Sequence, residues 1–241
     1  MKKKTATEAI HYRRSVRIQS EENIDPEVVK QCIENATLAP NSSNMQLWEF
    51  YHVHNPEFKN HIAAACFNQP AAKTAQQLVI PVVRRDLWRE RLEALKDHMR
   101  AEFAKAATRD PKKEANALAY LEKDLPKVYQ KKSVWLRWWN KRHMEIKGQS
   151  QPVYREIGAH DLKVIGHKSV ALAAQNFMIS MAEIGYDTCP MEGFDSLRIK
   201  QLLELPAEAD INMVIGCGIR AENGVYGPQF RLPMETVYFE K

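Results

Sequence analysis

Cysteine is scarce in this chain, and its four residues stand far apart, at positions 32, 66, 189 and 217. This spacing offers neither the paired thiols of a structural zinc site nor the density of a secreted disulfide scaffold. Nine glycines and 12 prolines among 241 residues also exclude collagen-like and low-complexity chains. No Gly-x-Gly-x-x-Gly follows a strand, so a dinucleotide-binding Rossmann domain is not supported. We therefore expect a cytoplasmic protein with reduced thiols.

Long apolar runs are also missing. The most apolar helical stretch, 169–184, contains Gln175, Asn176 and Glu183, and so falls short of the roughly 20 apolar residues that span a bilayer. The basic start of the chain is followed by polar Thr5–Glu8, where a signal peptide would need an apolar region. The sequence predicts neither secretion nor membrane insertion.

The composition itself is that of an ordinary globular protein, with 44% hydrophobic and 27% charged residues. A chain of this length can bury a self-sufficient core. The net charge of +5 is unevenly spread, because residues 84–150 hold 18 Lys and Arg against 10 Asp and Glu, a net of +8. This basic segment is rich in strong helix formers and predicts two or three helices. Its acidic residues are interspersed, which favours a solvated helix surface over a nucleic-acid-binding face.

The flanking segments mix helix and strand signals. Thr5 and Glu8 form a capping box, and Asp25-Pro26 is an N-cap followed by proline at the first helical position. Asn55-Pro56 opens a further helix by the same logic. The remaining expected elements are strands at 48–53, 78–83 and 211–219, a buried helix at 169–184 and a helix at 195–205. Pro81 suits a sheet edge or a strand end. The fold class predicted is α+β, with a sheet enclosed by helices.

Four short clusters carry polar chemistry. They are Arg13-Arg14-Ser15-Val16-Arg17, the loop Ala39–Trp48, the turn Cys189–Asp195, and Gln229-Phe230-Arg231-Leu232-Pro233. Arginine offers a planar fork that matches phosphate, and Asn and Ser side chains donate hydrogen bonds at close range. Each cluster also has a purely structural interpretation, as a solvated basic helix end, a tight turn or an exposed tail.

In order and approximate spacing, the four clusters resemble the motifs of the nitroreductase-like FMN-dependent oxidoreductase family. The resemblance covers residues 5–83 and 152–241, whereas the basic segment 84–150 looks like a longer helical insertion than typical members have. The resemblance implies one nitroreductase-like domain over 1–241, with a mostly antiparallel central sheet. It also implies an entwined homodimer with two FMN sites in the interface.

The same resemblance implies roles for the basic residues. Arg13 and Arg231 match the ligands of the FMN phosphate, and Arg14 and Ser15 match positions along the phosphate, ribityl chain and ring edge. Arg17 occupies the position of a basic residue near the flavin N1 and O2 edge. Independently of the family, a guanidinium there stabilises the negative charge that reduction places on that edge.

Further roles follow for the loops and turns. The resemblance implies that one loop reaches the cofactor from the other subunit, through Pro40, Asn41, Ser42 and Asn44. Gln46 belongs to the substrate side, and Asn68 matches an asparagine that bonds the pyrimidine part of the ring. The turn Pro190, Met191, Glu192 and Gly193 resembles the one whose backbone N–H, at Glu192, faces flavin N5. No metal site and no catalytic side chain are implied, since the flavin carries the hydride.

Three positions depart from the family pattern. Ala71 replaces a common lysine, Gln229 replaces a basic residue before the terminal arginine, and Leu47 stands where proline is commoner. The function expected is transfer of hydride from NADH or NADPH to nitroaromatic, quinone or similar acceptors, with ping-pong kinetics. A specialised flavin enzyme, such as a dehydrogenase or reductive dehalogenase, is the main alternative. A nucleic-acid-binding protein using 84–150 is the lesser one.

Other patterns are less specific. Trp135, Trp138 and Trp139 share one helix face, which favours a core role, although a lid over the substrate pocket is the sharper hypothesis. His52 and His54 face one side of a strand without a third metal ligand nearby, so ordinary polar positions are expected. Cys189 and Cys217 stand in apolar surroundings and are expected to be inert.

Overall fold

The computed structural model describes residues 3–106, 110–130, 133–156 and 158–241. In chain order the longer elements are α1 (Ala6–Tyr12), α2 (Pro26–Thr37), β1 (Trp48–Val53), α3 (Pro56–Ala65), α4 (Pro70–Lys73), β2 (Gln77–Val83), α5 (Trp88–Lys105), α6 (Pro111–Ala119), α7 (Leu125–Tyr129), α8 (Val134–Lys147), α9 (Ala159–Glu183), β3 (Asp187–Met191), α10 (Ser196–Leu202), β4 (Asp210–Ile211) and β5 (Val214–Gly218). Short turns of helix are η1 (Ser42–Asn44), η2 (Arg85–Leu87), η3 (Tyr120–Asp124) and η4 (Met234–Thr236).

The strands form one antiparallel sheet in the order β1-β2-β5-β3, with β4 beside β2. β2 is the central strand and all of its residues are buried. It pairs with β1 over its length, from Trp48 opposite Val83 to Val53 opposite Leu78. Within the described residues β3 ends the sheet on the far side, where Ser15 makes an isolated parallel bridge to Thr188.

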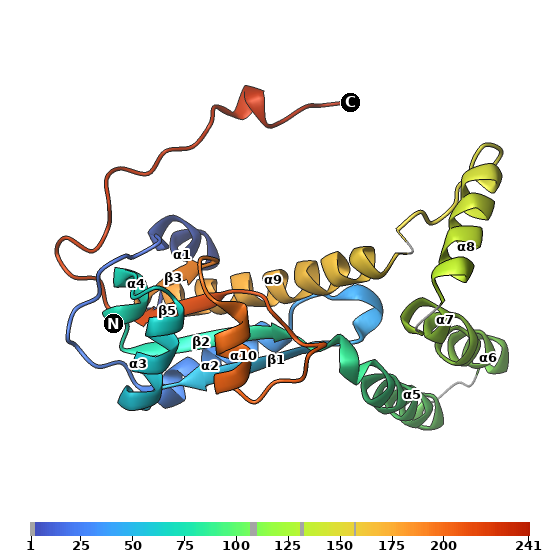
Figure 1. Cartoon of the computed structure of the whole chain (residues 1–241), viewed down its shortest axis with the longest axis horizontal. Helices are drawn as coiled ribbons and strands as arrows, with labels where there is room; N and C mark the ends of the chain where they lie inside the picture. Colours follow the sequence, from blue (N-terminus) through green and yellow to red (C-terminus); the bar gives the residue numbers. More distant parts are fainter. Residues whose placement is uncertain (1–2, 107–109, 131–132, 157) are drawn as a thin grey trace.

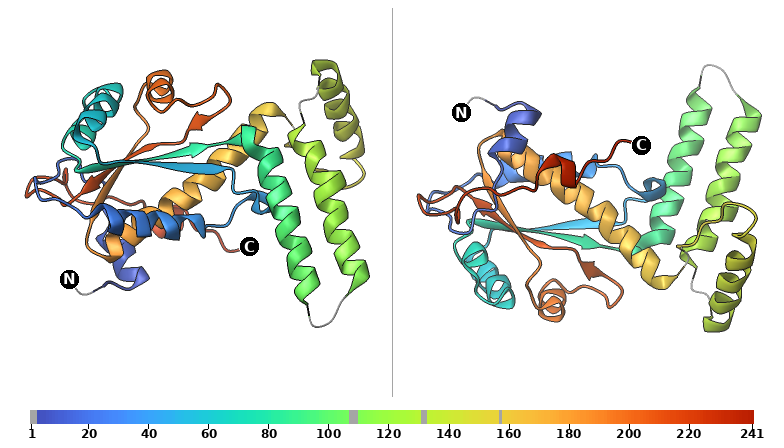
Figure 2. Two further views of the ribbon diagram at one scale, coloured as in Figure 1. Left: turned by 90° about the horizontal axis from the view of Figure 1, so that it is seen from below. Right: turned by 90° about the horizontal axis from the view of Figure 1, so that it is seen from above.

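Helices cover both faces of the sheet, as Figures 1 and 2 show. On one face α3, α4 and α10 bury an apolar cluster that includes Ile62, Ile80 and Ile199. On the other face α2 and the long helix α9 pack against the sheet around Phe177, which is fully buried. The predicted α+β architecture is therefore confirmed.

The predicted helix starts are confirmed by their caps. Thr5 and Glu8 form the reciprocal capping box of α1. The Asp25 carboxylate accepts a hydrogen bond from the Glu27 N–H, and Asn55 Oδ1 accepts one from the Phe58 N–H at 2.9 Å. Each cap satisfies an N–H that has no partner within its own helix.

Pro81 contradicts the expectation that it marks an edge or an end, because it lies inside the central strand opposite Phe50. Its carbonyl accepts a hydrogen bond from the Asn212 N–H at 3.0 Å, so the proline faces the short segment between β4 and β5. The regular ladder is interrupted at that point. A missing N–H is tolerated where no partner carbonyl needs it.

Three other boundaries differ from the expected ones. The strand expected at 211–219 is divided into β4 and β5, because the Asn212 side chain turns to His167, with Nδ2 3.0 Å from the ring Nδ1. The helix expected at 169–184 starts ten residues earlier, where the Gly158 N–H donates to Asp161 Oδ2. The helix expected at 195–205 ends at Leu202.

The basic segment forms three helical runs, α5, α6–η3–α7 and α8, as expected, and they project from one end of the sheet (Figures 1 and 2). Several of its basic residues pair with acidic ones inside the segment, including Arg100 with Glu122 at 2.9 Å and Lys127 with Asp124 at 2.8 Å. This supports the solvated-surface interpretation. In the part of the chain that the structure describes, no helix has the length and apolar character needed to cross a membrane.

The core role expected for the tryptophan cluster is wrong for two of its members. Trp135 and Trp139 on α8 are 74% and 61% exposed. The side chains of Arg137 and Trp138 lie outside the described residues. The apolar cluster of the insertion forms instead around Trp88 and Leu92 on α5 and Leu121 in η3. Helical spacing identified the shared face but not what covers it.

Two aliphatic residues of α10 test this packing. Ile199 is fully buried in the cluster with α3 and the sheet, whereas Leu197 is 64% exposed. We expect Ile199→Ala to lower the free energy of unfolding by about 2–5 kcal/mol, because it leaves a cavity in the core. Leu197→Ala, the matched control, should cost less than about 1 kcal/mol. Urea unfolding followed by circular dichroism measures both, and equal losses would contradict the described packing.

Candidate functional site

The segment Arg13–Arg17 lies along the outer edge of β3. The Val16 N–H donates to the Thr188 carbonyl at 3.1 Å, and the Val16 side chain is fully buried. This anchor fixes the backbone between Ser15 and Arg17. The arginine motif therefore sits beside a sheet edge rather than on a free helix end.

The C-terminal arm, residues 225–241, contacts this arginine motif. Arg14 Nη2 donates to the Gly227 carbonyl at 2.9 Å. Together the two segments line a cavity of about 320 Å³ formed by Arg13, Arg14, Ser15, Arg17, Val225, Tyr226, Pro228, Gln229, Phe230 and Arg231. Two of the predicted clusters, more than 200 residues apart in sequence, are thus brought together.

This cavity carries an unbalanced positive charge. In the described part of the chain, none of the ion pairs involves Arg13, Arg14, Arg17 or Arg231. Desolvation, followed by the charge of Arg231, lowers the pKa of the Arg13 guanidinium. Its Nη1 is buried without a hydrogen-bond partner. Leaving a buried N–H donor of a charged group without a partner is costly, so an anionic group fits this position.

A second pair of predicted segments meets next to β3. Gln69 Nε2 donates to the Gly193 carbonyl at 2.8 Å, and the Asp195 N–H donates to the Ala65 carbonyl at 2.8 Å. These bonds join the turn that holds Asn68, whose φ is 50°, to the end of β3. A side chain at Gly193 would meet only Gln69 Nε2, at 3.9 Å. The backbone there is accessible to a ligand.

The predicted turn at 190–193 needs one correction. Pro190 and Met191 belong to β3, and Met191 is buried in the apolar cluster under α3 and α10. A proline suits this outer strand. Only Glu192 and Gly193 lie beyond the strand and are exposed. The side chain of Met191 is therefore core, and what the segment offers to a ligand comes from its end.

The loop Pro40–Gln46 lies elsewhere. The Ser42 N–H donates to Ser169 Oγ at 3.3 Å, in the first half of α9, while Tyr12 at the end of α1 bonds the Gly185 carbonyl just beyond the end of that helix. At the rise of an α-helix these anchors are about 20 Å apart along α9. Figure 1 shows the loop beside the insertion, away from β3. Within one chain the loop and the arginine cavity do not meet.

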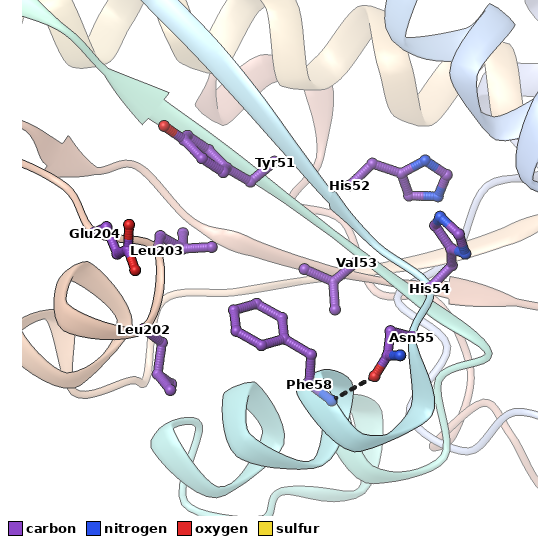
Figure 3. A pocket seen from close by; sticks show the side chains of 9 residues that line it. All are labelled: Tyr51, His52, Val53, His54, Asn55, Phe58, Leu202, Leu203 and Glu204. Carbon is purple, nitrogen blue, oxygen red and sulfur yellow. Dashed lines mark hydrogen bonds between the residues drawn. The ribbon is translucent and has the colours of Figure 1, made fainter.

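A second cavity, of about 350 Å³, holds none of the predicted cofactor or substrate residues. Figure 3 shows Phe58, Leu202 and Leu203 on one side of it, with His52 and His54 apart from them. His52 Nε2 lies 2.6 Å from Gln77 Oε1, and burial lowers its pKa. These contacts account for His52 without a ligand.

Sequence reasoning missed part of the arginine cavity. Val225, Tyr226 and Pro228 line it, and Gly227 has a φ of 68° that favours glycine. The run Gly-Val-Tyr-Gly-Pro was an available turn signal. Cys189 and Cys217 lie in apolar surroundings, as expected: both are fully buried, and burial raises the pKa of both thiols.

The unpaired Arg13 predicts a gain in stability when it is removed. We expect Arg13→Met to raise the free energy of unfolding by about 1 kcal/mol in protein freed of bound anions, because sites built for a ligand are destabilised without it. Arg220→Met is the contrasting control. Arg220 pairs with the buried Asp187, Nε to Oδ1 at 3.0 Å, and its loss should cost about 3 kcal/mol or more. A less stable Arg13→Met protein in urea unfolding would contradict the prediction.

A family model of the nitroreductase family matches residues 10–219. Protein DrgA of Synechocystis is 27% identical over 217 residues, covering 90% of this chain and 84% of DrgA.

Solved structures show the same fold. A Staphylococcus epidermidis protein provisionally named an NAD(P)H:FMN oxidoreductase has a TM-score of 0.73 at 21% identity, covering 100% of this chain and 98% of its own. A provisionally named nitroreductase of Exiguobacterium sibiricum, in complex with FMN, has a TM-score of 0.66 at 22% identity. The match covers 100% of this chain and 99% of the Exiguobacterium chain. The chain belongs to the nitroreductase family.

Proposed function

We propose that the chain is an FMN-dependent oxidoreductase that takes hydride from NADH or NADPH and passes it to nitroaromatic, quinone or similar acceptors. The observation that carries the proposal is the buried Arg13 Nη1 without a partner, in a cavity with three further arginines and no ion pair among the described residues. A phosphate monoester fits this charge, and one structural neighbour was solved with FMN. Family membership supports the same choice of ligand.

Each part of the site has a proposed task. Arg13 and Arg231 hold the phosphate, with Arg14 and Ser15 beside the ribityl chain and Arg17 near the N1 and O2 edge of the ring. Asn68, in the turn before α4, and the Glu192 N–H, at the end of β3, face the ring. A bound FMN supplies the two-electron chemistry, and the side chains bind, orient and set the local field.

The homodimer is part of the proposal, because the loop with Pro40, Asn41, Ser42 and Asn44 lies away from the arginine cavity of its own chain. A second copy can bring that loop, with Gln46 on the acceptor side, to the cavity. The arm supports such pairing. Six of its apolar side chains are between 55% and 76% exposed: Phe230, Leu232, Met234, Val237, Tyr238 and Phe239. Exposed apolar surface on this scale marks an interface.

The visible spectrum tests the proposal directly. We expect the purified protein to be a yellow dimer by absorbance and light scattering, and NADH or NADPH to bleach it without air. A colourless monomer that does not bind added FMN would contradict the proposal. Bleaching by only one of the two nucleotides would identify the donor.

Steady-state kinetics test the order of the reaction. If donor and acceptor use one face of the flavin in turn, double-reciprocal plots at several acceptor concentrations should be parallel. Intersecting lines would contradict this ping-pong scheme. The same assays with nitroaromatic and quinone acceptors would rank the substrate classes.

Arg17 tests the placement of the ring. We expect Arg17→Met to lower the midpoint potential of the bound flavin by roughly 30 mV for each 1.4 kcal/mol of lost stabilisation of the reduced form. Arg142→Met is the control, because it removes the same charge from α8, where the side chain is 64% exposed. An unchanged potential in Arg17→Met would remove Arg17 from the ring edge.

A further inference from the structure

The loop that follows α2 has an unusual backbone. Ser43, Asn44 and Gln46 have φ values of 53°, 52° and 48°, in the left-handed region that residues with a Cβ seldom adopt. Each such residue persists only where its surroundings hold it. Three of them within four positions therefore require contacts that hold the loop in this conformation.

Part of the support comes from inside the loop. The Asn41 side chain accepts a hydrogen bond from the Gln46 N–H at 2.8 Å, and its carbonyl accepts one from the Asn44 N–H at 3.2 Å. The Met45 N–H donates to the Ser42 carbonyl at 3.2 Å. These bonds tie the two ends of the loop together, but they leave the Ser43 side chain to another partner.

That partner belongs to the insertion. The Tyr120 hydroxyl lies 2.8 Å from Ser43 Oγ, across 77 residues of sequence. Tyr120 is 45% exposed, so its ring adds little to the core. The next residue, Leu121, is 5% exposed and packs in the apolar cluster of the insertion with Met45 of the loop. Leu121 thus holds Tyr120 in place while the Tyr120 hydroxyl reaches Ser43.

The turn that presents Tyr120 is itself distinctive. Tyr120–Asp124 form a π-helix, a wide turn that often occurs at functional sites. Arg100 on α5 braces it through Glu122, with Nη2 and Oε1 2.9 Å apart. Tyr120 is the first residue of this turn and has α-helical dihedral angles, with φ −59° and ψ −48°. The residue of the insertion that bonds the Ser43 side chain therefore stands at the start of a wide turn.

We propose that Tyr120 is a positioning residue of the flavin site, whose hydroxyl holds Ser43 in its left-handed conformation and so presets the loop Asn41–Gln46 for the cofactor. The part that concerns FMN rests on the proposed function, whereas the part that concerns the loop does not. Without the Tyr120–Ser43 hydrogen bond, a smaller fraction of the molecules has the loop in the conformation that binds the cofactor. The apparent dissociation constant rises in inverse proportion to that fraction.

Hydrogen–deuterium exchange of the flavin-free protein tests the loop alone. We expect Tyr120→Phe to speed exchange at the amides of Asn44, Met45 and Gln46 by about two- to tenfold, the effect of one lost hydrogen bond. Tyr154→Phe is the matched control. Tyr154 is 51% exposed, follows the same insertion and makes no hydrogen bond within the described residues. Unchanged exchange in Tyr120→Phe would overturn the proposal whatever the protein binds.

Flavin titration of the same variants tests the consequence for the site. We expect the dissociation constant for FMN to rise about two- to tenfold in Tyr120→Phe and in Ser43→Ala, and no further in the double variant. The thermal midpoint should stay close to that of wild type. Additive effects would overturn the proposal, because they would mean that Tyr120 contacts the ligand without Ser43.

The two proposals fail in different ways. If wild type binds no FMN while Tyr120→Phe still loosens the loop, the flavin function fails and the loop assignment stands. If wild type binds FMN and both variants bind it equally well, Tyr120 has no positioning role and the flavin function stands.

Discussion

The arginine cavity beside β3 holds positive charges that no carboxylate of the described chain neutralises, and its affinity for an anion depends on this excess charge. Elsewhere in the described chain many guanidiniums have a carboxylate partner, as Arg220 has Asp187 and Arg84 has Asp86. Arg13 has none, and it is also partly desolvated. Such an arrangement lowers the stability of the empty protein and is retained where an anion compensates it. The anchoring of Val16 against Thr188 makes the imbalance possible, because it fixes the arginines at the sheet edge.

The long helix α9 separates the loop Pro40–Gln46 from the arginine cavity. Its end lies next to α1 and the arginine motif, while its first half holds the loop through Ser169. A straight helix does not shorten, so the loop and the arginine cavity cannot close on one another within a chain. In the homodimer that we propose, a second copy would place its loop against the first copy's cavity. The exposed arm supplies apolar surface for such pairing.

Sequence reasoning succeeded where local chemistry decides the structure. Caps such as Asp25 and Asn55 begin helices through bonds two or three residues away, and β-branched runs such as 78–83 form strands almost anywhere in a sheet. It failed where distant partners decide. Pro81 is tolerated only because the ladder breaks at Asn212, and that break depends on His167, 45 residues away.

In the candidate site, too, local sequence patterns predicted some features and distant contacts decided others. Motif order placed Arg13 and Arg231 together, and the structure brings them to one cavity. Local pattern could not show that Met191 points into the core, because a buried strand and a ligand-binding turn use similar residues. The link from Tyr120 to Ser43 was equally hidden, since nothing in either segment marks the other.

The insertion and the loop after α2 share one apolar cluster. Met45 and Leu47 are buried with Leu92 and Leu125, so the loop is part of the insertion's packing rather than a segment beneath it. The motif resemblance places Leu47 where proline is expected, a residue that would stiffen the loop by itself. The basic helical segment constrains the loop instead, through apolar contacts on Met45 and Leu47 and through the Tyr120 hydroxyl on Ser43.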